Sequence, residues 1–91
     1  MKTKKRDRLE IIFDVLKVIS LNPRISPTPL SRKCNLTSAQ FANYFEELIN
    51  KEFIEILEVK KKKKIVLTQK GINFLNEFNK IVGILEDFDI W

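Results

Sequence analysis

One short stretch of the chain, residues 36–54, limits the possible folds more than any other. Thr37 is a favourable N-cap residue, and Gln40 three positions later completes the T-x-x-Q pattern of a capping box. Large apolar residues then recur at helical spacing, at Phe41, Phe45, Leu48 and Ile49. The sequence therefore predicts an amphipathic helix over residues 38–51 with a well-defined start.

The opposite face of this helix is polar and carries little charge. Its residues are Ser38, Gln40, Asn43, Tyr44 and Glu47. An ordinary surface helix can show the same pattern, so the helix alone does not decide its role. A helix held by its apolar back can, however, use such a front to read base edges in DNA.

A shorter helix is predicted just before it. Thr28 serves as the expected N-cap, and Pro29 stands at the first helical position, where its missing N–H costs nothing. This helix should end at Cys34, with Leu30 and Cys34 facing inward as small and medium apolar residues. Asn35 suits a left-handed helix terminus. A short helix, a turn and a longer capped helix have the spacing of a helix-turn-helix.

A β-hairpin with a basic tip is predicted after the two helices. Residues 53–59 and 65–67 have strand composition, and the unbroken run Lys60–Lys64 lies between them. Beside a helix-turn-helix such a hairpin is a wing, whose lysines can spread over a phosphate backbone. The alternative is a solvated loop that only prevents edge-to-edge association.

The chain opens with another predicted helix, from Arg6 to Ser20. Asp7 marks its start and Asn22-Pro23 its end. Apolar residues cover so much of this helix that at least two other elements should pack on it: Leu9, Ile11, Ile12, Phe13, Val15, Leu16, Val18 and Ile19. Ile25 could pair at the edge of a sheet.

The last predicted helix, Gln69 to about Asp89 after the cap residue Thr68, carries two apolar stripes. Ile72, Leu75 and Val82 form one stripe, which can pack on the core of the chain. The other is a heptad seam of Phe74, Phe78, Ile81, Leu85 and Phe88. One small domain has little left to cover this seam from Phe78 onward, so a second copy of the helix is the expected cover. The alternative is a helix that folds back over its own domain.

Composition narrows the function. The 91 residues have a formal net charge of +5, which favours a polyanionic partner. Cys34 is the only cysteine, and no apolar run approaches the length of a membrane span, so a cytoplasmic, nucleoid-associated protein is expected. The chain has no histidine and no glycine-rich phosphate loop. We therefore expect no enzyme activity, no metal, no cofactor, no membrane contact and no small-molecule ligand.

Taken together, these segments resemble winged-helix proteins, and more narrowly the archaeal ten-kilodalton DNA-binding proteins. The resemblance rests on RLEIIFDVLKVIS, TPLSRKCNLT, FEELINKEFIE and VLTQKG, which span nearly the whole chain. It implies dimerisation through an antiparallel C-terminal coiled coil. The sequence departs from this family at two places. Glu52 stands where the family usually has glycine after the recognition helix, which predicts a strained or altered turn. The wing is also richer in lysine than is typical of the family.

The resemblance also implies which residues face DNA. These are Arg32, Lys33, Thr37, Ser38, Gln40, Asn43, Tyr44, Lys60, Lys61, Lys62, Lys63 and Lys64. Asn43 and Gln40 would bond to base edges, Tyr44 would contact sugar-phosphate or a thymine methyl, and the cations would neutralise phosphates. Gln40 has a second possible use, because an amide that closes a capping box is less free to read a base.

The sequence thus predicts a mainly α protein with one small β-hairpin (α+β). Residues 1–68 would form the winged helix-turn-helix and residues 69–91 the dimerisation helix, as one structural unit. The expected function is double-stranded DNA binding by a homodimer, either as a local transcription regulator or as a chromatin protein. The alternative is a protein-interaction module within a transcription or replication assembly.

Overall fold

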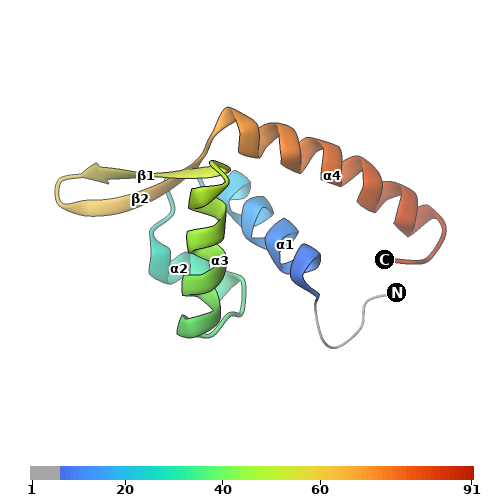
Figure 1. Cartoon of the computed structure of the whole chain (residues 1–91), viewed down its shortest axis with the longest axis horizontal. Helices are drawn as coiled ribbons and strands as arrows, with labels where there is room; N and C mark the ends of the chain where they lie inside the picture. The colour runs from blue at the N-terminus through green and yellow to red at the C-terminus, as the bar shows by residue number, and fades with distance from the viewer. Residues whose placement is uncertain (1–6) are drawn as a thin grey trace.

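The computed structural model describes residues 7–91, which form four helices and one hairpin (Figure 1). The elements are α1 (Arg8–Leu21), α2 (Pro27–Lys33), α3 (Ser38–Asn50), β1 (Ile54–Val59), β2 (Lys62–Leu67) and α4 (Gln69–Asp87). The hairpin is antiparallel. The predicted fold class, mainly α with a small hairpin, is confirmed. The predicted start of the first helix at Arg6 lies outside the described residues.

Helix α1 is the centre of the molecule because its apolar residues surround most of its circumference. Asp7 is its N-cap, accepting a hydrogen bond of 2.8 Å from the backbone N–H of Glu10. Helices α2 and α4 and strand β2 all pack against α1. Its buried residues are Ile11, Ile12, Phe13, Val15, Leu16 and Ile19. Leu9, predicted to join them, is 52% exposed at the start of the helix.

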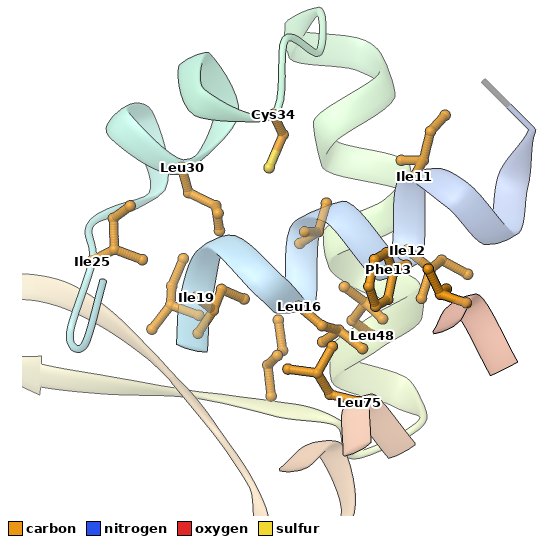
Figure 2. Close-up of a cluster of buried hydrophobic side chains, with 14 residues drawn as sticks. Ile11, Ile12, Phe13, Leu16, Ile19, Ile25, Leu30, Cys34, Leu48 and Leu75 are labelled. Carbon is orange, nitrogen blue, oxygen red and sulfur yellow. The ribbon is translucent and has the colours of Figure 1, made fainter. Parts of the chain in front are cut away.

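The other elements each send apolar side chains toward α1. Figure 2 shows Leu30 of α2 and Cys34, the C-cap of α2, on one side of α1. Leu48 of α3 and Leu75 of α4 lie on other sides of α1. Ile54 and Ile65 add the base of the hairpin. None of the buried side chains in residues 7–91 is polar or charged. The fold is therefore held by apolar burial, and the predicted burial of Cys34 is confirmed.

Helix α2 begins two residues earlier than predicted. Its N-cap is Ser26, with Pro27 as the first helical residue, so the expected cap at Thr28 was wrong. Ser26-Pro27 and Thr28-Pro29 are equally good helix starts by sequence, and in the folded chain the helix begins at the first of them. Ile25 pairs with Ile65 of β2, whose N–H donates to the Ile25 carbonyl at 2.9 Å. This pairing confirms the predicted edge position of Ile25 and ends the extended segment at Ser26.

The hairpin is longer than predicted, and its turn is shorter. Val59 pairs with Lys62, so only Lys60 and Lys61 form the turn, and the predicted five-lysine tip was wrong. Both turn residues have positive φ, 51° and 64°, as in a type I′ turn. Burial of Ile65 on the core side fixes the register of β2, and that register leaves no room for a longer loop.

Helix α4 starts at the predicted cap, where the Thr68 hydroxyl accepts from the Gly71 N–H at 3.0 Å. Leu75 and Val82 are buried as predicted, whereas Ile72 is 39% exposed. The helix ends at Asp87 rather than Asp89. Among the described residues, no helix combines the length and apolar character that crossing a bilayer requires.

Two phenylalanines of the α4 seam are covered within the chain. The ring of Phe74 stacks on Phe53 at 4.7 Å between centroids, and Phe78 stacks on Phe13 at 5.0 Å. Trp91 meets Phe13 and Phe78 edge-on, at 6.0 and 6.1 Å. The expectation that Phe78 would lack cover in its own chain therefore does not hold.

The chain returns to Phe78 through a left-handed residue after α4. Asp89 has φ 59°, its N–H donates to the Glu86 carbonyl, and the Ile90 N–H donates to the Leu85 carbonyl at 2.8 Å. This pair of hydrogen bonds is a Schellman motif, which reverses the chain direction. It brings Trp91 back against α1.

Gly71 allows the first turn of α4 to cross the segment before β1. A Cβ added at Gly71 would lie 2.0 Å from the carbonyl oxygen of Phe53. That oxygen also accepts a hydrogen bond of 3.0 Å from the Thr68 N–H. The backbone therefore cannot move aside without losing this bond.

We expect Gly71→Ala to lower the free energy of unfolding by about 1–3 kcal/mol, because the added methyl group overlaps backbone atoms. Urea denaturation followed by circular dichroism measures the change. Gly83→Ala is the matched control, since nothing lies within 4 Å of a Cβ there. A loss at Gly71 no larger than the change at Gly83 would contradict the close approach.

Candidate nucleic-acid interface

The start of α3 is fixed by the predicted capping box. The Thr37 hydroxyl accepts from the Gln40 N–H at 3.2 Å, and the Thr37 N–H donates to the Gln40 side-chain oxygen at 3.1 Å. Both side chains are exposed at the first turn, beside exposed Ser38. The oxygen of the Gln40 amide is thus already in use, which leaves its Nε2 as the group available to an outside acceptor.

The turn between α2 and α3 is a Schellman motif. Asn35 has φ 56°, as its type predicts, and its N–H donates to the Arg32 carbonyl at 3.0 Å. The Leu36 N–H donates to the Ser31 carbonyl, and the Ser31 hydroxyl donates back to the Leu36 carbonyl at 3.3 Å. These bonds hold α2 and α3 in a helix-turn-helix. The predicted contact residues Arg32 and Lys33 are exposed in the last turn of α2.

The exposed face of α3 differs from the predicted polar front. Besides Ser38 and Gln40, its exposed residues are Ala39, Ala42, Asn43, Glu46 and Asn50. Asn43 lies on this face as predicted, whereas Tyr44 is half-buried against the core. The sequence prediction missed the two alanines, Glu46 and Asn50. Steps of three or four residues from Asn43 reach Ala39 and Glu46, and a further step of four from Glu46 reaches Asn50.

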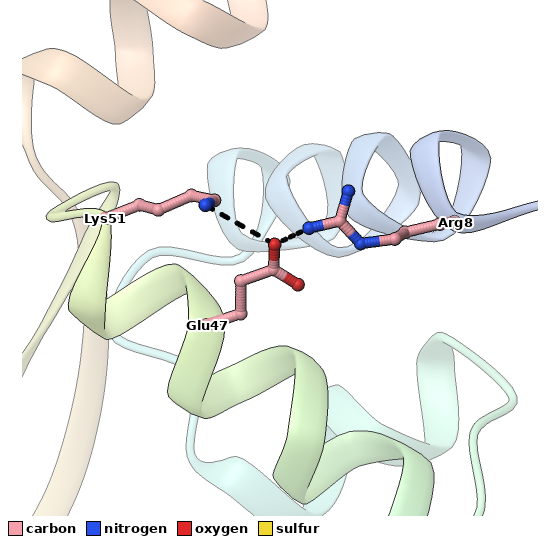
Figure 3. A network of polar contacts seen from close by, with 3 residues as sticks. All are labelled: Arg8, Glu47 and Lys51. Carbon is pink, nitrogen blue, oxygen red and sulfur yellow. Dashed lines mark ion pairs between the residues drawn. The ribbon is translucent and has the colours of Figure 1, made fainter.

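Glu47, also placed on the polar front, is turned toward α1 instead. Its carboxylate pairs with the guanidinium of Arg8 and lies 3.6 Å from the Nζ of Lys51 (Figure 3). The pairing joins the first turn of α1 to the last turn of α3. Glu47 therefore helps to orient α3 and is not among its outward-facing residues.

The lysines of the wing point in several directions. Lys60 and Lys61 form the turn, while Lys62 and Lys63 lie on opposite faces of the hairpin because alternate strand residues do so. These four are exposed. Lys64 is half-buried at the base of the wing, and its Nζ donates to the Ser26 hydroxyl at 3.2 Å. The hairpin thus presents positive charge on both faces and at its tip.

The turn from α3 into the wing keeps a left-handed shape without glycine. Glu52 has φ 63°, and the N–H groups of Glu52 and Phe53 donate to Ile49 and Leu48 in a third Schellman motif. The Thr68 hydroxyl also donates to the Glu52 carbonyl. Glutamate in place of glycine therefore adds backbone strain at this turn, but the Schellman hydrogen bonds still form.

Helix α3, which carries the exposed polar residues, and the basic hairpin lie at the same end of the molecule. Figure 1 shows α2, α3 and the hairpin at this end, while the second half of α4 extends toward the other. Within residues 7–91, no three His, Cys, Asp or Glu side chains gather as a metal site would require. The exposed lysines at this end are suited to contacting a polyanion.

The profile of winged helix-turn-helix proteins matches residues 5–86 of this sequence. The chain belongs to the winged helix-turn-helix family. This result confirms the winged-helix resemblance inferred from the order of the segments. No curated protein is similar enough to the chain to count as a match.

Solved structures with the same fold include DNA-binding regulators. Sso10a-2, a DNA-binding protein from Sulfolobus solfataricus, aligns with a TM-score of 0.77 at 20% identity, over 91% of this chain and 85% of its own. MepR, a transcription regulator of the Staphylococcus aureus efflux pump MepA, aligns with a TM-score of 0.77 at 18% identity, over 88% and 62%. CouR, a transcriptional repressor bound to a 23-mer DNA duplex, gives 0.73 at 20% identity, over 78% and 52%.

The archaeal neighbour is similar in extent as well as in fold. The match spans most of Sso10a-2 but a smaller share of MepR and CouR, which are longer than this chain. This agrees with the narrower resemblance to small archaeal DNA-binding proteins. The winged helix of this family member therefore has the fold of DNA-binding regulators.

We expect Glu52→Gly to raise the free energy of unfolding by up to about 1 kcal/mol, because glycine adopts positive φ without a steric penalty. Urea denaturation measures the change. Lys51→Gly is the matched control, since Lys51 has φ −84° and gains nothing from glycine. Equal losses of stability in the two variants would contradict the assignment of strain to Glu52.

Proposed function

We propose that this winged-helix protein binds double-stranded DNA as a homodimer, with α3 in the major groove and the wing on the phosphate backbone. The observation that carries the proposal is that α3, with its exposed polar residues, and the hairpin with its exposed lysine turn lie at the same end of the molecule. The predicted contact residues Arg32, Lys33, Ser38 and Asn43 are all exposed at that end. A DNA partner would place the protein on the nucleoid.

Charge supplies most of the proposed affinity. Lys60 and Lys61 at the turn can reach phosphates whichever face of the hairpin approaches the duplex, and either Lys62 or Lys63 adds a contact on that face. Arg32 and Lys33 add contacts from α2. Each subunit would then neutralise about 3–5 phosphates. Lys64 would contribute charge at the base of the wing while bonded to Ser26.

The known neighbours support the proposal by analogy. CouR binds a DNA duplex and Sso10a-2 is a DNA-binding protein, although their sequence identity to this chain is low. MepR is a transcription regulator. Regulation of transcription is therefore the role we favour for DNA binding here.

A second copy of the chain would cover the distal part of α4. Ile81 and Phe88 of the predicted seam are 53% and 73% exposed, and Ile84 is also exposed, with Leu85 half-buried beside them. Each large apolar side chain gains about 1.5–3 kcal/mol when fully buried. Because Phe74 and Phe78 already pack within the chain, we confine the proposed dimer contact to this distal part, Ile81, Ile84, Leu85 and Phe88.

We expect simultaneous reversal of Lys61, Lys62 and Lys63 to Glu to abolish most of the DNA affinity, because the wing would repel phosphates. Fluorescence anisotropy with a labelled duplex at several salt concentrations measures the affinity. The unaltered dimer should give a log K against log salt slope of roughly −5 to −9. In the variant, each phosphate that is no longer neutralised should make this slope shallower by about 0.9.

The control variant reverses Lys17, Lys70 and Lys80 to Glu, which are exposed lysines of α1 and α4. It changes the formal net charge from +5 by the same six units. We expect it to retain far more affinity than the wing variant. Similar affinities for the two variants, or a slope shallower than about −2 for the unaltered protein, would contradict the wing contacts.

We expect Ile81→Glu to shift the protein from dimer to monomer, because a carboxylate would be buried without a partner in the proposed contact. Sedimentation velocity at micromolar concentration measures the mass. Leu21→Glu is the control, since Leu21 is also exposed, 69% against 53% for Ile81, but lies at the end of α1. An unaltered protein that sediments as a monomer rules the dimer out.

A further inference from the structure

The outward face of α3 has a composition that bears on which base pairs it can recognise. Its exposed residues are Ala39, Ala42, Asn43, Glu46 and Asn50, with no arginine or lysine among them. We propose that this face selects adenine–thymine pairs in the major groove. The proposal rests on the DNA binding proposed above and adds the class of sequence that is bound.

Guanine is poorly matched to this face. In the major groove guanine presents two acceptors, N7 and O6, which arginine or lysine usually contacts. The one lysine at the end of α3, Lys51, lies 3.6 Å from the carboxylate of Glu47 and is directed toward α1. Glu46, on the outward face, can only accept hydrogen bonds when ionised, so it cannot bond to either guanine acceptor; the donors that it could meet are adenine N6 and cytosine N4, and it does not by itself discriminate between the two kinds of pair.

Adenine is well matched. It presents an acceptor at N7 and a donor at N6, and an asparagine amide can bond to both at once. Asn43 and Asn50 are exposed two turns apart on the same face of α3. Gln40 offers the same chemistry in principle, but its oxygen already accepts from the Thr37 N–H. Asn43 is therefore the main adenine reader that we propose, with Asn50 second.

The two alanines complement the asparagines. Thymine carries a C5 methyl group in the major groove, and alanine is among the residues that contact it. Ala39 is one turn before Asn43, and Ala42 is adjacent to it, so both methyl groups flank the proposed adenine contact. Thymines paired with that adenine or next to it would place their methyl groups against the two alanines.

The decisive experiment uses three duplexes of equal length, built entirely from A·T, inosine·C or G·C pairs in mixed order. Inosine·C has the major-groove groups of G·C but lacks its minor-groove amino group, as A·T does. Anisotropy competition with the full chain at one salt concentration measures the relative affinities. We expect the A·T duplex to bind at least about 5-fold more tightly than both of the others.

Each other outcome overturns the proposal in a distinguishable way. Equal binding of A·T and inosine·C, both tighter than G·C, would assign the preference to the minor groove or to DNA bending. Equal binding of all three duplexes would mean that the protein contacts only the DNA backbone. This result would contradict base selection but agree with the proposed DNA binding. No binding to any duplex would overturn the proposed function as well.

Two further changes test the named residues. Asn43→Ala should lower the A·T over G·C ratio by about 5-fold or more, toward unity. Asn79→Ala, which changes an exposed asparagine of α4, should leave the ratio unchanged. Replacing thymine with deoxyuridine removes the methyl groups and should weaken binding to the unaltered protein. An unchanged ratio for Asn43→Ala, or unchanged binding to the deoxyuridine duplex, would overturn the corresponding contact.

Discussion

The whole architecture depends on the need to bury a helix that is apolar on nearly every side. Leu16 of α1 is fully buried, and Ile12 and Val15 are almost so, although no single neighbour could cover them all. Helices α2 and α4 and strand β2 each pack against α1, while α3 contributes Leu48 to the same core. Helix α3 and the base of the hairpin are therefore held in fixed positions by contacts on the side away from solvent.

Most of the fold could be predicted from sequence because its signals are local. Thr37 with Gln40, Asp7, Thr68 and Asn35 each determine a helix end through hydrogen bonds to nearby backbone. The start of α2 and the length of the hairpin could not be predicted, because they depend on Ile25 and Ile65, which are 40 residues apart in the sequence and meet only in the folded chain.

In the candidate site too, local features could be predicted from sequence and features that depend on distant contacts could not. Its exposed cations could be listed from sequence, but the direction of Glu47 and Tyr44 depends on where α1 and the core lie. The wing lysines were predicted as a set, whereas their distribution over two faces follows from the strand register. Stacking of Phe78 on Phe13 could not be predicted either, because a heptad pattern does not distinguish a partner helix from the chain's own residues.

The return of the chain after α4 gives the molecule an internal optical reporter. Trp91 is the only tryptophan, and its indole lies against Phe13 and Phe78, at the end of the molecule away from the hairpin. Its emission therefore reports on whether the C-terminal residues remain closed over α1. Because the indole is remote from the basic end, its signal can follow folding while a polyanion occupies the other end.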